Sequence, residues 1–289
     1  MSPEQLESEI RDLFDQDTPD RRRARAAVAG LLTALDRGDV RAARRGDEGW
    51  EAVSWVKQGI LLAFRVGHTQ NFRPWIPGTN EAFAGSDFSF ADRDTLPLRR
   101  LDGPSENVRI VPGGSSVRAG VHLGSGVVVM PPAYINVGAR VGDGSMIDSH
   151  ALVGSCAQVG DRVHLSAGAQ LGGVLEPIGL RPVIVEDDAM IGANCGIFEG
   201  TLVGEGAVLA PGVQLTGSTA VHDLVRDEIY RASSETPLTI PPGAVVVPGS
   251  RPASGKVGRL SGIQLYVPVI VKYRDAKTDA ATALEDALR

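Results

Sequence analysis

The segment from Met146 to Pro177, MIDSHALVGSCAQVGDRVHLSAGAQLGGVLEP, carries an aspartate, two histidines and a cysteine among small and aliphatic residues. A carboxylate such as that of Asp148 orients a donor or accepts a proton, and histidine is the commonest general base near neutral pH. Neither Cys156 nor Cys195 has a neighbouring base in the sequence that would activate a thiol nucleophile. The pattern therefore favours acid–base chemistry over a covalent cysteine intermediate.

The scaffold that carries these groups is a repeat of six residues. Four residues after most aliphatic anchors stands a small or β-branched residue, and Leu175 is the bulky exception. A period of six fits neither a helix nor a single strand, but it fits short strands joined by tight turns and stacked as a solenoid. The sequence predicts a mainly β fold, a parallel β-helix of triangular section. The anchors are Val111, Val117, Leu123, Val129, Ile135, Val141, Ile147, Val153, Val159, Leu165 and Leu171, then Val185, Ile191, Ile197, Val203, Leu209, Leu215 and Val221.

The repeat is interrupted once, between Leu171 and Val185, by a stretch with Pro177, Gly179 and Pro182. We expect a loop at about 173–183 that leaves the prism and rejoins it. A loop expelled from a solenoid commonly lies on its binding face, and a tolerated surface insertion is the alternative.

The flanks divide the chain into three parts. Residues 1–107 predict a helical N-terminal domain, with helices over 3–14, from Asp20 to about Arg37, and over 50–66, followed by an irregular connector from 67 with a strand or two. Residues 108–223 form the predicted β-helix. Residues 224–289 predict a small mixed tail, with strands over 244–250 and 263–273 and a terminal helix over 279–289.

Composition excludes several function classes. A net charge of −6 and a pI near 5.4 give no basic surface for nucleic acid. The chain has neither a long apolar run nor a secretory signal, so we expect no membrane association and a cytoplasmic location. Two cysteines without paired spacing, and histidines without a close His-x4-His pair, predict no metal site. Because aliphatic anchors fill the prism, a small-molecule site is expected outside it, in a groove between subunits of a homo-oligomer.

Segments spread over nearly the whole chain match the pattern of one known family. They are LLAFR (61–65), FADRD (90–94), VRIVPGG (108–114), YINVGARVGDGSMID (134–148), VGSCAQVGDRVHLSAG (153–168), GGVLEP (172–177), VIVEDDAMIGA (183–193) and VIVKYRDAKT (269–278). Through them the chain resembles the tetrahydrodipicolinate N-succinyltransferase family of hexapeptide-repeat acyltransferases. The resemblance implies left-handed winding, a homotrimer, succinyl-CoA as acyl donor and a diacid amine as acceptor, in lysine and diaminopimelate biosynthesis.

The resemblance also implies roles for individual residues. It assigns Arg109 to a substrate carboxylate and Asp148 to the acceptor amine, as binding and catalytic group. Asp148 follows the inward Ile147, so its side chain should point outward. Glu199 is the retained glutamate of its stretch and is expected to be catalytic. Lys256, with Arg251 nearby, is expected to meet the coenzyme phosphates.

Three departures from the family pattern leave donor and acceptor open. The chain reads DSHA where relatives read DTWA, and GANCGIFEG where they read GARSEVVEG, which places His150, Asn194 and Gly196 at changed positions. Acetyl-CoA, or another amino-acid-like acceptor in a tailoring pathway, is therefore the alternative. His150 is a second candidate base, against a plain turn histidine, and His164 is expected to be a packed or interface residue. A non-catalytic hexapeptide subunit is the remaining hypothesis.

Overall fold

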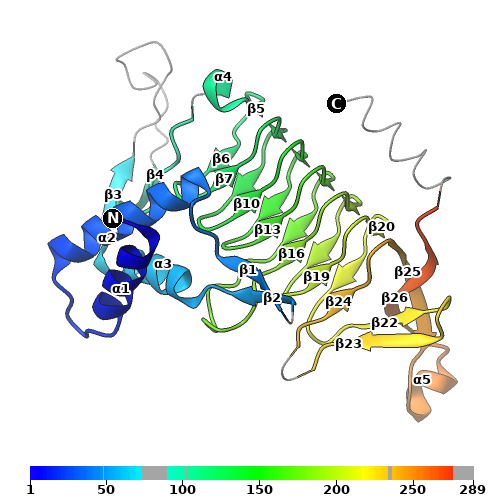
Figure 1. Ribbon diagram of the computed structural model, residues 1–289. Helices are drawn as coiled ribbons and strands as arrows, with labels where there is room; N and C mark the ends of the chain where they lie inside the picture. The colour runs from blue at the N-terminus through cyan, green and yellow to red at the C-terminus, as the bar shows by residue number, and fades with distance from the viewer. Residues whose placement is uncertain (48, 73–89, 102, 234–235, 276–289) are drawn as a thin grey trace.

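The computed structural model describes residues 1–47, 49–72, 90–101, 103–233 and 236–275. Figure 1 shows a stack of short strands, with helices beside its N-terminal strands and a long hairpin at the other end. Among the described residues, no helix has the length and apolar character needed to cross a bilayer.

The stack is a parallel β-helix built from three sheets. Each strand pairs in parallel with the strand three hexads later, as β11 does with β14 through Met146↔His164 and Ile147↔Leu165. We name the sheets by one member. The β11 sheet also holds β5, β8, β14, β17, β20 and β25 and continues into β26, β22 and β23 beyond the stack; the β12 sheet holds β6, β9, β15, β18 and β21, and the β13 sheet holds β7, β10, β16, β19 and β24.

The strands of the stack are two residues long except β25. They are β5 (Arg109–Ile110), β6 (Ser116–Val117), β7 (His122–Leu123), β8 (Val128–Val129), β9 (Tyr134–Ile135), β10 (Arg140–Val141), β11 (Met146–Ile147), β12 (Leu152–Val153), β13 (Gln158–Val159), β14 (His164–Leu165), β15 (Gln170–Leu171), β16 (Ile184–Val185), β17 (Met190–Ile191), β18 (Gly196–Ile197), β19 (Leu202–Val203), β20 (Val208–Leu209), β21 (Gln214–Leu215), β24 (Thr239–Ile240) and β25 (Ala244–Pro252).

The predicted anchors form the core of the prism, where residues such as Ile147 and Leu165 are fully buried. One anchor is wrong. Val111 is only half-buried, and its neighbour Ile110 pairs with the inward Val129 instead. The first corner contains one extra residue, which Gly113 and its glycine neighbour accommodate with positive φ.

Three helices form the N-terminal domain: α1 (Pro3–Phe14), α2 (Arg21–Arg37) and α3 (Ser54–Val66). Their apolar faces share one core. The helix predicted over 50–66 is too long, because β1 (Ala43–Gly46) and β2 (Gly49–Ala52) form a hairpin there. Gly49, at φ +114, supplies a turn conformation that few other residues adopt.

The N-terminal domain packs on the β13 sheet. Asp36, at the end of α2, accepts hydrogen bonds from the backbone N–H groups of Gly120 (2.8 Å) and Val121 (3.1 Å). The interruption loop runs between β15 and β16, and the buried Lys57 of α3 donates a hydrogen bond to its Leu180 carbonyl. The loop is thus attached to the N-terminal domain.

The remaining elements flank the stack. The connector contains β3 (Thr69–Phe72) and β4 (Phe90–Arg93), while residues 73–89 lie outside the described chain. The short α4 (Gly103–Glu106) precedes β5. After the stack come β22 (Ala220–Asp223), β23 (Glu228–Arg231), α5 (Lys256–Leu260) and β26 (Gln264–Tyr273).

Both predicted C-terminal strands are present, as β25 and β26, and they form a long antiparallel hairpin. The helix predicted over 279–289 lies outside the described residues. β24 and β25 pair with β19 and β20 and extend two of the three sheets beyond residue 223, so two strands of the predicted tail belong to the stack. The division at 107 and 223 stays a prediction.

Asp94 ties the connector to α2, and its replacement should weaken the fold in a pH-dependent way. Its carboxylate pairs with Arg25 and accepts the His68 backbone N–H, and these contacts lower its pKa from 3.8 to about 2. A depressed carboxylate pKa stabilises the fold above the ordinary value, and the benefit is lost as pH falls through the folded value. Asp94→Asn should therefore cost about 1–3 kcal/mol of unfolding free energy at pH 7.

The measurement is urea unfolding of wild type and Asp94→Asn between pH 7 and pH 2. The difference should shrink below about pH 4 and vanish near pH 2. The control is Asp12→Asn, whose carboxylate pairs with Arg23 in an exposed position and should matter little. A difference that does not depend on pH would exclude this role of the Asp94 charge.

Candidate functional site

Asp148 stands at the corner where the chain leaves β11 for β12. Its backbone N–H donates to the Leu165 carbonyl (2.9 Å), which fixes the corner to the next coil. Its Oδ1 accepts the Ser149 backbone N–H (2.7 Å), and its side chain is 30% exposed. The carboxylate is thus held by the backbone on one oxygen and open to the surface, a geometry that suits a proton acceptor.

His164 lies beside Asp148, a pairing that was not predicted from the sequence. Its Nε2 is 3.9 Å from Asp148 Oδ2, and only 12% of its side chain is exposed. The prediction of a packed histidine agrees with this burial. A signal for the pairing was available, because three hexads separate His164 from Met146 and bring their strands together.

His150 occupies the turn position of the same corner. Its φ is +63°, and its backbone N–H donates to the Pro132 carbonyl. Cys156 stands at the equivalent position of the next corner, with φ +66°. Within the described chain, no ion pair or hydrogen bond joins His150 to Asp148. The geometry accounts for His150 as an exposed turn residue, and its role as a base stays a prediction.

Arg109 lies on the Asp148 side of the prism. It is exposed on β5, and one strand, β8, separates β5 from β11 in the sheet. Two strand spacings amount to about 10 Å. A shallow hollow of about 350 Å³ opens beside Arg109 and includes Asn107 and Val128. An extended diacid could reach from this guanidinium to Asp148.

Glu199 lies on a different edge of the prism from Asp148. It is in the corner between β18 and β19, which joins the β12 sheet to the β13 sheet, and its Oε2 accepts the Gly217 backbone N–H. One protomer therefore does not bring the two predicted catalytic carboxylates together.

Arg251 and Lys256 belong to the hairpin of β25 and β26, and both are exposed. The hairpin is anchored to the stack where Tyr266 accepts the Gln214 backbone N–H (2.7 Å). In the β11 sheet, four strand spacings separate β25 from β11, or about 19 Å. The basic residues are thus far from Asp148 but lie toward the same edge.

The two changed residues near this edge have different surroundings. Asn194 forms the turn of the corner between β17 and β18, with φ +56°, and its carbonyl accepts the Gln214 side-chain amide (2.9 Å). Gly196 is buried under Gln214 and Phe198: a Cβ there would lie 2.2 Å from Gln214 Oε1 and 2.5 Å from Phe198 Cε2. These side chains fill the space that a larger residue at 196 would need.

Gly196→Ala should lower the unfolding free energy by about 1–3 kcal/mol, because the Phe198 ring and the Gln214 amide must both shift. Chemical denaturation at fixed protein concentration measures the change. Gly179→Ala is the matched control: no atom lies within 4 Å of its built Cβ, so the effect should stay within about 0.5 kcal/mol. Equal midpoints for the two variants would contradict the packing described at Gly196.

Among the described residues, no group of three or more His, Cys, Asp or Glu side chains is placed to hold a metal ion.

Comparison with known proteins identifies the family of this chain. The model named "Tetrahydrodipicolinate N-succinyltransferase N-terminal" matches residues 5–66, and "Hexapeptide repeat of succinyl-transferase" matches residues 182–217. A 2,3,4,5-tetrahydropyridine-2,6-dicarboxylate N-succinyltransferase of Idiomarina loihiensis is 39% identical over 99% of this chain and 98% of its own. The enzyme of that name from Nitrosospira multiformis is 41% identical over 99% of both chains. The chain therefore belongs to the tetrahydrodipicolinate N-succinyltransferase family of hexapeptide-repeat acyltransferases.

Proposed function

We propose that this protein transfers the succinyl group of succinyl-CoA to the amino group of 2-amino-6-oxopimelate, the open-chain form of tetrahydrodipicolinate, in lysine and diaminopimelate biosynthesis. The observation that carries the proposal is the identity of 39–41% to N-succinyltransferases over almost the full length of both chains. A cytoplasmic location fits this role and stays a prediction.

The transfer is a direct displacement at the thioester. The acceptor amine attacks the succinyl carbonyl, a C–N bond forms, the C–S bond breaks, and coenzyme A leaves as a thiolate that takes up a proton. The nitrogen must lose a proton during the attack, and we assign its acceptance to Asp148 Oδ2, since Oδ1 is held by Ser149. His164, 3.9 Å from Oδ2, positions that carboxylate. Both cysteines are buried, and burial raises the pKa of Cys156 to about 12, so an acyl-cysteine intermediate is not part of the scheme.

The β11 sheet orders the substrates along one edge. We place the acceptor between Arg109, which holds a carboxylate, and Asp148, which faces the amine. The donor then extends in the opposite direction, toward the hairpin with Arg251 and Lys256. The separation of about 19 Å between β11 and β25 suits an extended coenzyme whose phosphates are remote from its thioester.

The proposed assembly is a homotrimer of left-handed β-helices with sites between protomers. The separation of Glu199 from Asp148 within one protomer supports this arrangement, because a composite site would allow two edges from different protomers to meet. Sedimentation equilibrium tests the trimer, and a monomer that retains full activity would exclude a composite site.

Purified protein tests the function through coenzyme A release from succinyl-CoA, with tetrahydrodipicolinate or L-2-aminopimelate as acceptor. We expect release that depends on the acceptor and saturates with it. Release at the same rate without acceptor would indicate thioester hydrolysis and would refute the proposed transfer.

Acetyl transfer, or transfer to another amino-acid-like acceptor, is the second candidate function. The observation that favours it lies at Gly196, which stands where the family pattern has a glutamate and where Phe198 and Gln214 fill the space beside the backbone. Phe198 and Gln214 would also be the residues to vary if acetyl-CoA proves the better donor.

A further inference from the structure

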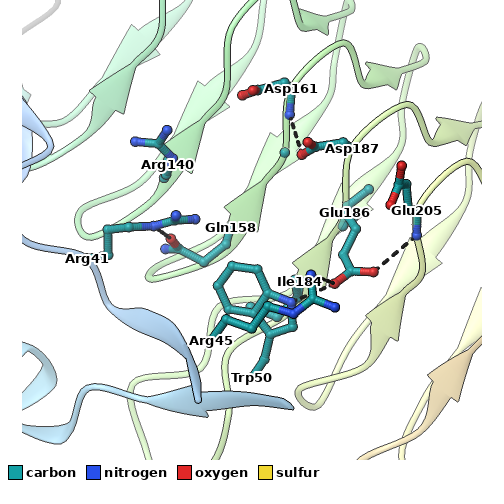
Figure 2. Close-up of a pocket in the computed structure, with 12 residues that line it drawn as sticks. Arg41, Arg45, Trp50, Arg140, Gln158, Asp161, Ile184, Glu186, Asp187 and Glu205 are labelled. Carbon is teal, nitrogen blue, oxygen red and sulfur yellow. Dashed lines mark hydrogen bonds and ion pairs between the residues drawn. The ribbon is translucent and has the colours of Figure 1, made fainter. Parts of the chain in front are cut away.

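A second pocket, of about 250 Å³, lies between the β1–β2 hairpin and the outer face of the β13 sheet (Figure 2). The hairpin and the segment before it contribute Arg41, Arg45 and Trp50, and successive strands contribute Arg140 and Gln158. Within one chain, this face of the β13 sheet is separate from the edge that carries Asp148.

The arginine side of the pocket has a positive charge that no direct ion pair within the described residues neutralises. Arg41 Nε donates to Gln158 Oε1 (3.2 Å), and its guanidinium stacks over Trp50 at 5.3 Å from the ring centre. Burial, together with the charge of Arg140, lowers the pKa of Arg41 to about 10. No carboxylate of the described residues forms an ion pair with Arg41 or Arg140. Asp161 and Asp187 act on Arg41 in the opposite sense but offset only part of this effect. Two cations that share a wall without a direct ion pair make a site for an anion.

The opposite side of the pocket is acidic. Asp161 and Asp187 belong to a ladder of corner aspartates, in which Asp187 Oδ1 accepts the Asp161 backbone N–H (2.9 Å). Figure 2 shows both on the far side of the pocket from Arg41. Arg45 lies 3.7 Å from Glu186 and offsets the charge of that carboxylate. Glu205 also lines the pocket, and its side chain forms no ion pair with another described residue.

The lining as a whole has three arginines and four carboxylates. It therefore offers two positive groups on one side and carries a slight excess of negative charge. A ligand that satisfies both sides has one carboxylate, more than one ammonium group and a chain that can pack against an aromatic ring. Those are the properties of a basic amino acid, and the volume suits a molecule of that size.

We propose that this pocket binds a basic α-amino acid, with its carboxylate between Arg41 and Arg140 and its ammonium groups toward the carboxylates of the opposite wall. The bound molecule would link the N-terminal hairpin to the solenoid. This inference goes beyond the acyl transfer and does not depend on it.

The test is equilibrium dialysis and calorimetry of the full chain with L-lysine as probe. L-Norleucine, which lacks the second ammonium group, and pentane-1,5-diamine, which lacks the carboxylate, are the matched probes. We expect one L-lysine per chain and affinity at least about tenfold weaker for each matched probe. No binding of L-lysine at about 10 mM, or equal binding of all three, would overturn the proposal.

Variants separate this pocket from the acyl-transfer site. Arg140→Gln should weaken L-lysine binding at least about tenfold, while Arg44→Gln, an exposed arginine of the same hairpin paired with Glu51, should change it less than about twofold. Asp148→Asn should leave it unchanged, because the acceptor site is elsewhere. Loss of binding in Asp148→Asn, or unaltered binding in Arg140→Gln, would contradict the assignment.

Stability without ligand gives a second readout. Since Arg140 lies near the cationic Arg41 and forms no ion pair within the part of the chain that the structure describes, Arg140→Gln should leave the Tm unchanged or raise it. A marked fall in Tm would mean that Arg140 already has a stabilising partner, and the proposed anion seat would then be wrong.

Discussion

Asp148→Asn is expected to lower kcat by about 10²–10⁴-fold and to change the Kd for coenzyme A less than about twofold. The amide keeps an oxygen that accepts the Ser149 backbone N–H, so the corner should fold as in the wild type. It cannot accept the proton that the attacking amine releases. The loss should therefore appear in the chemical step and leave coenzyme binding in place.

Steady-state kinetics, with coenzyme A binding measured separately, gives both quantities. Asp227→Asn is the matched control, because Asp227 is also an exposed turn aspartate, with φ +56°. It should keep wild-type kcat. If Asp148→Asn turns over like the wild type, Asp148 is not the proton acceptor; if coenzyme A no longer binds, the carboxylate has a structural role instead.

Ile147→Ala is expected to destabilise the protein by about 2–5 kcal/mol. Ile147 is fully buried, directly precedes Asp148, and stacks between Val129 and Leu165 of the neighbouring coils. Each flat side of a coil contributes only one inward aliphatic residue. Truncation of that residue therefore leaves a cavity.

Denaturant unfolding at a fixed protein concentration measures this effect. Ile229→Ala is the control, since Ile229 is 51% exposed on β23 and its truncation should cost less than about 0.5 kcal/mol. Similar losses for both variants would contradict the account of the prism core, in which burial of the anchors holds the coils together.

The hexad pattern predicted the prism because one aliphatic residue in each hexad is buried, so the inward positions can be counted along the sequence. Ile147 and Leu165 are inward as expected, and Asp148 is at an outward corner. Positions on one edge of the prism recur every third hexad. The hexad count therefore also predicts that His164 lies near Asp148 and that Glu199 lies away from both. These relations follow from stacking and needed only the period of one full coil.

Other features depend on how separate parts dock, which no local pattern encodes. The pocket joins Arg41, before the first hairpin strand, to Arg140 of the solenoid, and the sequence distance between them carries no periodic signal. The strand over 49–52 was missed because its aromatic and aliphatic residues also fit the helix that follows. Val111 was displaced by a single extra residue in a glycine-rich corner, which a strict count of six cannot register.

The most direct test of the central claim is a competition between equal concentrations of succinyl-CoA and acetyl-CoA for limiting tetrahydrodipicolinate, with the acylated products separated by mass spectrometry. Under competition, the product ratio reports the ratio of kcat/KM for the two donors. We expect succinylated product in at least about tenfold excess over acetylated product. Predominantly acetylated product, or no acylated acceptor from either donor, would contradict it.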